Sequence, residues 1–157
     1  MPNLRAEIAP APPPLDTELG PSHWITITQD MIDQFGLLTR DPDPMHVDPT
    51  WAEQNGPYGG SIAFGFLTLS LLTHLLHDAV GSTPQAEQRA PGHFLNYGFD
   101  RLRFVSPVPV GARIRGVFRV SDRAIDARGR WLTTFDCKIE IEGQERPALV
   151  ADWLSIW

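Results

Sequence analysis

The stretch of sequence that decides the fold is residues 59–77, which read GGSIAFGFLTLSLLTHLLH. A turn of small residues leads into a segment whose apolar side chains occupy nearly every face at helical spacing. We therefore expect a helix that begins between Ser61 and Phe64 and ends near His77. A helix that is apolar almost all round must be enclosed by the rest of the domain on most of its sides.

After this helix the pattern of apolar residues changes. Residues 81–91 are polar and predict a loop, and apolar residues then alternate with charged ones over Ile114–Val120 and Trp131–Ile141. Turn residues over 124–130 and 143–146 predict hairpins between strands. About four strands then follow one helix, which predicts an α+β fold: a long buried helix wrapped by an antiparallel sheet.

The N-terminal segment differs from the rest of the chain. Residues 1–22 hold six prolines. Proline fixes φ and has no N–H donor, so we expect an extended arm outside the core. The apolar Leu15 and Leu19 would allow the end of the arm to pack on the domain. Residues 23–157 are then a single domain, because a chain of 157 residues is the usual size of one.

Two helix starts are indicated by capping residues. Thr28 is a good N-cap for a helix over residues 29–38, whose apolar residues recur at helical spacing. Asp48 followed by Pro49 predicts the start of a second, short helix that ends near Gln54.

Composition restricts the partners and the compartment. The net charge of −6 argues against nucleic acid or an anionic membrane as the main partner. Cys137 is the only cysteine, so no internal disulfide can form. The N-terminus lacks a signal pattern, and the apolar stretch 62–76 is shorter than the roughly 20 residues that span a bilayer. We therefore expect a cytoplasmic protein.

The first candidate for chemistry is the segment DPDPMHVDP, residues 41–49. Each aspartate precedes a proline, which favours extended backbone and predicts a stiff, irregular, non-helical segment. Asp41 and His46 on such a segment are a candidate acid–base pair, since histidine can take and give a proton near neutral pH. The alternative is that Asp41 is a turn residue and His46 a packed surface imidazole, and spacing alone favours this alternative.

The second candidate is the start of the apolar helix near Gly65. Unpaired N–H groups at a helix N-terminus can hold a carbonyl oxygen that gains negative charge during a reaction. The alternative is an ordinary turn in which the glycines at 59, 60 and 65 serve backbone conformation.

Other combinations of residues in the sequence give weaker indications of a functional site. The acidic residues around His46 lack the glycine and distal glutamate of an EF-hand, so no metal site is predicted there. His74 and His77 lie near a helix C-terminus, where histidines are commonly dipole partners and not ligands. The chain contains no G-x-S-x-G motif, phosphate-binding loop or dinucleotide fingerprint. Cys137 alternates with apolar residues and is expected to be inert core.

Together these segments resemble a known family. The Asp41–Pro49 segment and the apolar helix that follows it resemble the MaoC-like dehydratase signature, also called the hydratase-2 motif. They look like the branch of that family that includes nodulation protein N. Residues 96–104, 107–111 and 147–151 resemble strands of that branch, and the likeness covers roughly residues 18–157.

The resemblance implies a hot-dog fold and a homodimer whose two sheets join. It implies reversible hydration of trans-2-enoyl thioesters, carried by coenzyme A or by acyl carrier protein, to (R)-3-hydroxyacyl thioesters. In this family the residues matching Asp41 and His46 activate a water, and the N–H matching Gly65 polarises the thioester carbonyl. No metal or redox cofactor is implied.

The chain departs from the family pattern at three positions. Asp43 stands where the family often has Asn, and Phe64 stands where it usually has His. Thr73 matches a family serine and keeps its hydroxyl. Thr73 and Ser61, in the turn before the helix, are therefore expected to support the site.

Arginines are concentrated in one block. Residues 101–130 contain eight arginines and two aspartates. Arg101 and Arg103 are candidates for contacts with coenzyme A phosphates, and the alternative is a solvated outer face of the sheet. The alternation places Arg113, Arg115, Arg119 and Arg123 together on that outer face.

Two other functions remain open from sequence. A hot-dog acyl-CoA thioesterase would release thiol without consuming the enoyl group. A non-catalytic acyl-thioester-binding dimer would bind acyl-CoA tightly without turnover. The presence of both Asp41 and His46 argues against the non-catalytic binding protein.

Overall fold

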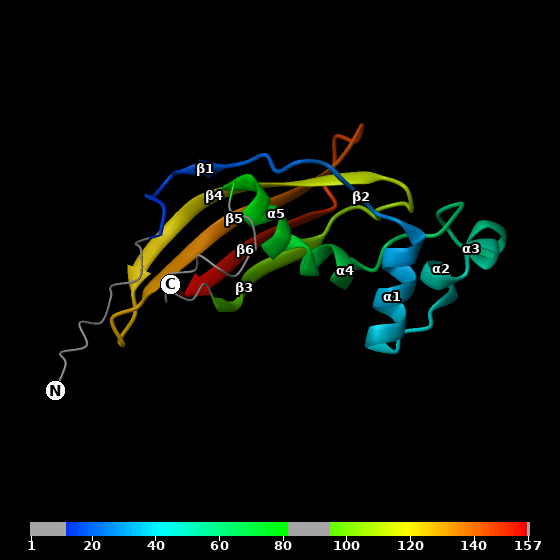
Figure 1. Ribbon diagram of the computed structural model, residues 1–157, viewed down its shortest axis with the longest axis horizontal. Coiled ribbons are helices and arrows are strands. Elements are labelled where there is room, and N and C mark those ends of the chain that lie inside the picture. The colour runs from blue at the N-terminus through cyan, green and yellow to red at the C-terminus, as the bar shows by residue number, and fades with distance from the viewer. Residues whose placement is uncertain (1–11, 82–94, 157) are drawn as a thin grey trace.

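The computed structural model describes residues 12–81 and 95–156 of the chain. The elements in chain order are β1 (Glu18–Leu19), β2 (Ile25–Thr26), α1 (Gln29–Thr39), α2 (Pro44–Val47), α3 (Pro49–Asn55), α4 (Gly65–Ser70), α5 (Leu72–Ala79), β3 (Leu95–Phe104), β4 (Arg113–Ile125), β5 (Trp131–Ile141) and β6 (Leu149–Ile156). Figure 1 shows a long sheet with α4 and α5 along one face and the cluster α1–α3 beyond one end.

The sheet is antiparallel and has the order β1-β4-β5-β6-β3, with β2 also paired to β4. The predicted alternation is present: Ile114, Phe118 and Val120 of β4 are fully or almost fully buried, as are Phe135 and Ile139 of β5. An antiparallel sheet packed on helices confirms the predicted fold class.

The apolar helix is not the single helix that we expected. Residues 61–64 are extended, with the N–H of Ala63 bonded to the carbonyl oxygen of Val108, and the helix divides at Leu71 into α4 and α5. In α4 the hydroxyls of Thr68 and Ser70 bond to carbonyl oxygens four residues earlier, at 3.4 and 2.7 Å. Such back-bonding bends helices, which explains the interruption.

Burial of the two helices also differs from expectation. Leu72, Leu75 and Leu76 of α5 pack against the sheet and are almost completely buried. Phe66 of α4, in contrast, exposes 66% of its surface. The expectation of a helix enclosed on most sides is therefore wrong for α4, which covers the sheet with one face only.

A bulge in β4 corrects one assignment of face. Arg119 pairs with Asp136 on the outer face, but the register shifts between Val120 and Asp122, and Arg123 then pairs with the buried Thr133. One extra residue moves every later side chain to the opposite face. Arg123 therefore lies on the inner face, with its guanidinium 4.6 Å from the centre of the Trp131 ring.

The described end of the N-terminal arm lies along β4. Leu19 packs against the core, whereas Leu15 is exposed. The buried Ser22 exchanges bonds with β4: its hydroxyl accepts from the N–H of Gly116 at 2.9 Å, and its own N–H donates to the Gly116 carbonyl. Residues 1–11 of the arm, and nearly all of the expected loop at 81–91, lie outside the described residues.

Within residues 12–81 and 95–156, no helix is long and apolar enough to cross a bilayer.

Candidate active site

The helices at the end of the sheet are fixed by side chains that cap and connect them. The hydroxyl of Thr28 accepts from the N–H of Met31 at 3.3 Å, which confirms Thr28 as the N-cap of α1. Gln29, the first residue of α1, donates from Nε2 to the backbone oxygen of His46 at 2.8 Å. This bond ties α2 to α1, so the position of His46 depends on the start of α1.

The proline-rich segment is more regular than its sequence predicts. Residues 44–47 form α2, and His46 lies on this helix, so the expectation of a wholly non-helical segment is wrong. Asp43 is the N-cap, with Oδ1 accepting from the N–H of Met45 at 2.9 Å. Proline at the first helical position costs no hydrogen bond, because that N–H has no partner in a helix. Asp48 caps α3 in the same way, as predicted.

The orientation of the His46 ring is set by the extended segment before α4. Nδ1 of His46 lies 2.7 Å from the backbone oxygen of Ile62. A carbonyl oxygen can only accept, so Nδ1 carries the hydrogen and donates it. In the neutral ring, Nε2 then keeps its lone pair and can accept a proton. The ring also packs on Phe64, with 3.9 Å between ring centres.

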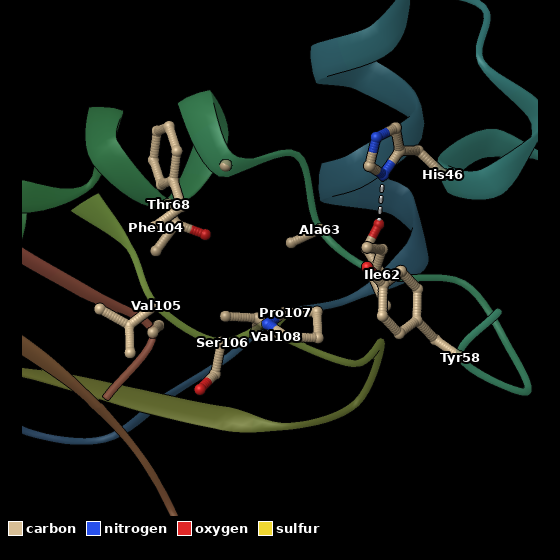
Figure 2. A pocket seen from close by; sticks show the side chains of 12 residues that line it. His46, Tyr58, Ile62, Ala63, Thr68, Phe104, Val105, Ser106, Pro107 and Val108 are labelled. Carbon is tan, nitrogen blue, oxygen red and sulfur yellow. Dashed lines mark hydrogen bonds between the residues drawn. The ribbon is translucent and has the colours of Figure 1, made fainter. Parts of the chain in front are cut away.

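His46 lines a cavity of about 320 Å³ between α2, the start of α4 and the segment after β3. Figure 2 shows His46 and Tyr58 on one side of this space and Thr68 and Phe104 on the other. The remaining lining residues are Ile62, Ala63, Gly65, Val105, Ser106, Pro107, Val108 and Ala148. More than half of the lining residues are apolar, and His46 supplies the one imidazole among them.

Gly65 also lines this cavity, as the first residue of α4. The N-cap of α4 is Phe64, which has no side-chain oxygen, so no side-chain cap occupies the N–H groups of the first turn. A Cβ at position 65 would lie 3.1 Å from the ring of Phe104. A larger residue at position 65 would therefore crowd Phe104, and His46 and the start of α4 line the same cavity.

Asp41 occupies a different position from His46. Asp41 is exposed and follows α1, where its N–H donates to the backbone oxygen of Gly36 at 3.0 Å. Its Oδ1 accepts from the N–H of Asp43 at 3.2 Å. Asp41 is not among the residues that line the cavity. Of the predicted pair, the described structure places His46 at the cavity wall and Asp41 in the turn that leads to α2.

The expected supporting residues lie outside the cavity wall. Ser61 is buried, and its hydroxyl has no hydrogen-bond partner among the described residues. Thr73 is half-buried on α5. Arg101 forms an ion pair with Asp152 at 2.6 Å, which raises the pKa of Arg101. Arg103 donates to the backbone oxygen of Leu102 at 2.7 Å.

Sequence reasoning missed most of the cavity wall. Tyr58 lies between the α3 helix and the glycine turn, and an aromatic residue among glycines and prolines was the available signal. Phe104 and the segment after it, including Ser106, reach the cavity from the far end of β3. No local pattern marks these residues, because pairing of β3 with β6 brings them to the site.

Metal-ligating side chains do not cluster in the described part of the chain: no three His, Cys, Asp or Glu side chains gather there in a way that could hold an ion. Cys137 is completely buried in β5, and burial raises the pKa of its thiol. His23, outside the cavity, pairs with Asp78 at 3.0 Å and lowers the pKa of that carboxyl.

Comparisons with known proteins agree on one family. The MaoC like domain family matches residues 10–134. Nodulation protein N of Rhizobium leguminosarum bv. viciae is 42% identical over 149 residues, which cover 95% of this chain and 89% of that protein. The 3-hydroxyacyl-thioester dehydratase Z of Mycobacterium tuberculosis is 38% identical over 135 residues, covering 86% and 85%. The solved (R)-hydratase of A. caviae superposes with a TM-score of 0.71 at 20% identity, covering 90% and 95%.

Proposed function

We propose, from the premise that this chain belongs to the MaoC-like domain family, that it catalyses the reversible hydration of trans-2-enoyl thioesters to (R)-3-hydroxyacyl thioesters. Relatives 38% identical to it are 3-hydroxyacyl-thioester dehydratases, and the chain is a lyase of the hydratase and dehydratase type. The observation that carries the substrate proposal is the cavity that His46 and Gly65, the first residue of α4, both line together with several apolar side chains.

His46 is the proton-transferring residue of this proposal. With Nδ1 donating to Ile62, the free lone pair of Nε2 accepts a proton from water while the hydroxide adds to C3 of the enoyl group. In the reverse direction the protonated Nε2 returns that proton to the leaving hydroxyl. The reaction moves a proton and a hydroxide and no electrons, so its chemistry needs no redox cofactor.

The start of α4 is the electrophilic part of the proposed site. Negative charge develops on the thioester oxygen as C3 is attacked, and we assign the N–H of Gly65, at the uncapped start of α4, to donate to that oxygen. The charge returns to C2 when C2 takes a proton. Phe104, Val105 and Val108 would border the acyl chain, because they form the apolar part of the same cavity.

Asp41 completes the proposed acid–base pair. In the described structure its carboxylate accepts from Asp43 and is exposed, five residues before His46 on the same proline-stiffened segment. We assign Asp41 to hold the water and to take part in the second proton transfer at C2. Mutation of Asp41 distinguishes this role from that of a turn residue.

A homodimer belongs to the same proposal. Among the described strands, β3 pairs only with β6, which leaves its other edge open. Tyr97, Phe99 and Phe104 of β3 are exposed, and Phe66 of α4 packs edge-to-face on Phe104 with 5.8 Å between ring centres. An open edge flanked by exposed aromatic residues fits a second copy of the chain, which would also cover the mouth of the cavity.

Coenzyme A or acyl carrier protein would carry the acyl group. Arg103 has no carboxylate partner among the described residues, whereas Arg101 is paired with Asp152. Arg103 is therefore the better candidate of the two for a phosphate contact. A higher KM for acyl-CoA with unchanged kcat in Arg103→Ala would support that contact.

The proposal is tested with crotonyl-CoA and the wild-type chain. We expect loss of the enoyl absorbance without thiol release, because water adds to C3 and the thioester stays intact. Thiol release with retained enoyl absorbance would identify a thioesterase. Tight binding of the thioester with neither change would identify a non-catalytic binding protein.

A further inference from the structure

We infer that Phe64 is a positioning residue for His46: its ring packs on the imidazole and holds it in the orientation in which Nδ1 is bonded to the oxygen of Ile62. This role rests on the function proposed above. Phe64 lies directly before Gly65 and is 96% buried, with 4% of its surface exposed. It is not itself among the residues that line the cavity, so it acts through His46.

The contact between the two rings is close. Their centres are 3.9 Å apart, and their planes are inclined by 33°. One face of the imidazole is therefore covered by a hydrocarbon ring, which has no donor or acceptor of its own. Phe64 consequently restricts the tilt of the imidazole without competing for Nε2 or for a water bound to it.

Phe64 and Ile62 act on the same imidazole from one extended segment. The Ile62 oxygen holds Nδ1 at 2.7 Å at the edge of the ring, and the Phe64 ring packs on its face. The segment itself is anchored by the bond from the N–H of Ala63 to Val108 and by the bridge between Ile62 and Pro109. Two restraints in different directions leave the ring little freedom to rotate.

The far side of Phe64 is fixed by α1. Its ring centre lies 5.3 Å from that of Phe35, and its Cζ atom approaches to 3.2 Å from where a Cβ of Gly36 would stand. Gly36 therefore leaves room for a side chain as long as phenylalanine. Phe64 fills the whole distance between α1 and the imidazole, and a shorter aliphatic side chain cannot cover the ring in the same way.

Two substitutions of Phe64 distinguish the effect of a flat ring stacked on His46 from the effect of filling the same volume with an apolar side chain. Phe64→Leu keeps an apolar side chain but removes the flat ring, whereas Phe64→His keeps a flat ring and loses contact with Gly36. We expect Phe64→Leu to lower kcat roughly 10- to 100-fold with little change in KM, because misplacement of a reacting group by about 1 Å costs this much. Phe64→His should recover a substantial part of the lost kcat, although it is also destabilised.

The matched control is Phe118→Leu. Phe118 is 1% exposed in the core, on β4 and outside the cavity wall, so this variant loses the same volume without touching His46. Thermal unfolding is measured for all three variants. Phe118→Leu should lower Tm and leave kcat per folded molecule unchanged, which shows that loss of stability alone does not reduce turnover.

An independent readout is the proton resonance of the His46 ring, assigned with His46→Gln. Stacking on Phe64 shifts the carbon-bound imidazole protons upfield through the ring current, and Phe64→Leu should return them downfield. An unchanged His46 resonance, or a kcat that Phe64→Leu leaves at the wild-type value, would overturn the positioning role. A wild-type chain with no hydratase activity would instead overturn the proposed function, while the His46 resonance would still report the stack.

Discussion

The Nδ1 atom of His46 donates to the backbone oxygen of Ile62 across 2.7 Å. This bond joins α2 to the extended segment that leads into α4, two parts of the chain that lie sixteen residues apart. It brings the histidine of the proline-rich segment and the start of the apolar helix to one cavity, and it leaves Nε2 as the free nitrogen.

Replacement of Gly65 should damage the site more than the fold. In Gly65→Ala the new Cβ would lie 3.1 Å from the Phe104 ring, so either the ring or the start of α4 must move. We expect kcat/KM to fall roughly tenfold or more, because the N–H that we propose to bind the thioester carbonyl is displaced. Gly60→Ala is the matched control, since a Cβ at position 60 meets nothing within 4 Å. Equal activity of the two variants would contradict the role of Gly65.

Loss of the N-cap of α2 should lower turnover, because α2 carries His46. Asp43→Ala removes the oxygen that accepts from Met45, and loss of an N-cap costs about 1 kcal/mol. We expect the four-residue α2 to fray and kcat to fall. Asp43→Asn keeps an acceptor oxygen at the cap and should retain most of the activity. The two variants are compared by steady-state kinetics, and an equal loss in both would indicate that the charge of Asp43, and not its cap, is needed.

The close packing of α5 on β4 should contribute measurably to the free energy of unfolding. A Cβ on Gly116 would lie 2.7 Å from the Phe118 ring and 2.9 Å from Cβ of Leu75, which cannot move without the helix. Overpacking of this kind costs about 1–3 kcal/mol, so Gly116→Ala should lower the free energy of unfolding in urea by that amount. Gly98→Ala on β3, where a Cβ meets nothing within 4 Å, is the control.

Acid should weaken the fold through carboxylates on the outer face of the sheet. Lys138 and Arg115 hold the pKa of Glu140 below its usual value of 4.5. A lowered pKa in the folded state stabilises the fold above the unfolded value, and this contribution disappears as the pH falls through the folded value.

The test is urea unfolding of the wild type and Glu140→Gln between pH 7 and pH 3. The free energy of unfolding should fall less steeply below pH 4.5 in Glu140→Gln than in the wild type. Glu53→Gln is the control, because Glu53 is exposed on α3 and makes no ion pair among the described residues. If the free energy of unfolding falls equally in the wild type and in Glu140→Gln below pH 4.5, the ion pairs of Glu140 are screened by solvent and do not stabilise the fold.

Local patterns predicted the elements of this fold well. The period-two alternation gave the faces of β4 up to Val120, and the capping residues Thr28 and Asp48 marked the starts of α1 and α3. These features are local, because they depend on alternation and on hydrogen bonds within a few residues. A bulge is not encoded in alternation, and so Arg123 was assigned to the wrong face.

The candidate site could be predicted only in part, for a similar reason. His46 and Gly65 carry sequence signals and do line one cavity, whereas Phe104, Val105 and Ala148 reach it through pairing of distant strands. The helix α2 was missed because Asp-Pro pairs favour extended backbone, although Asp43 and Pro44 also suit the N-cap and first position of a helix.

We propose that His46 takes a proton from water in this cavity as the hydroxide adds to an enoyl thioester, and returns that proton in the reverse reaction. The most direct test of this claim is the rate of crotonyl-CoA hydration by the wild type, His46→Gln and Asp41→Asn, with chiral analysis of the product. We predict (R)-3-hydroxybutyryl-CoA from the wild type and turnover lowered by about 10²- to 10⁴-fold in each variant. Hydration that continues at the wild-type rate in both variants would contradict the claim.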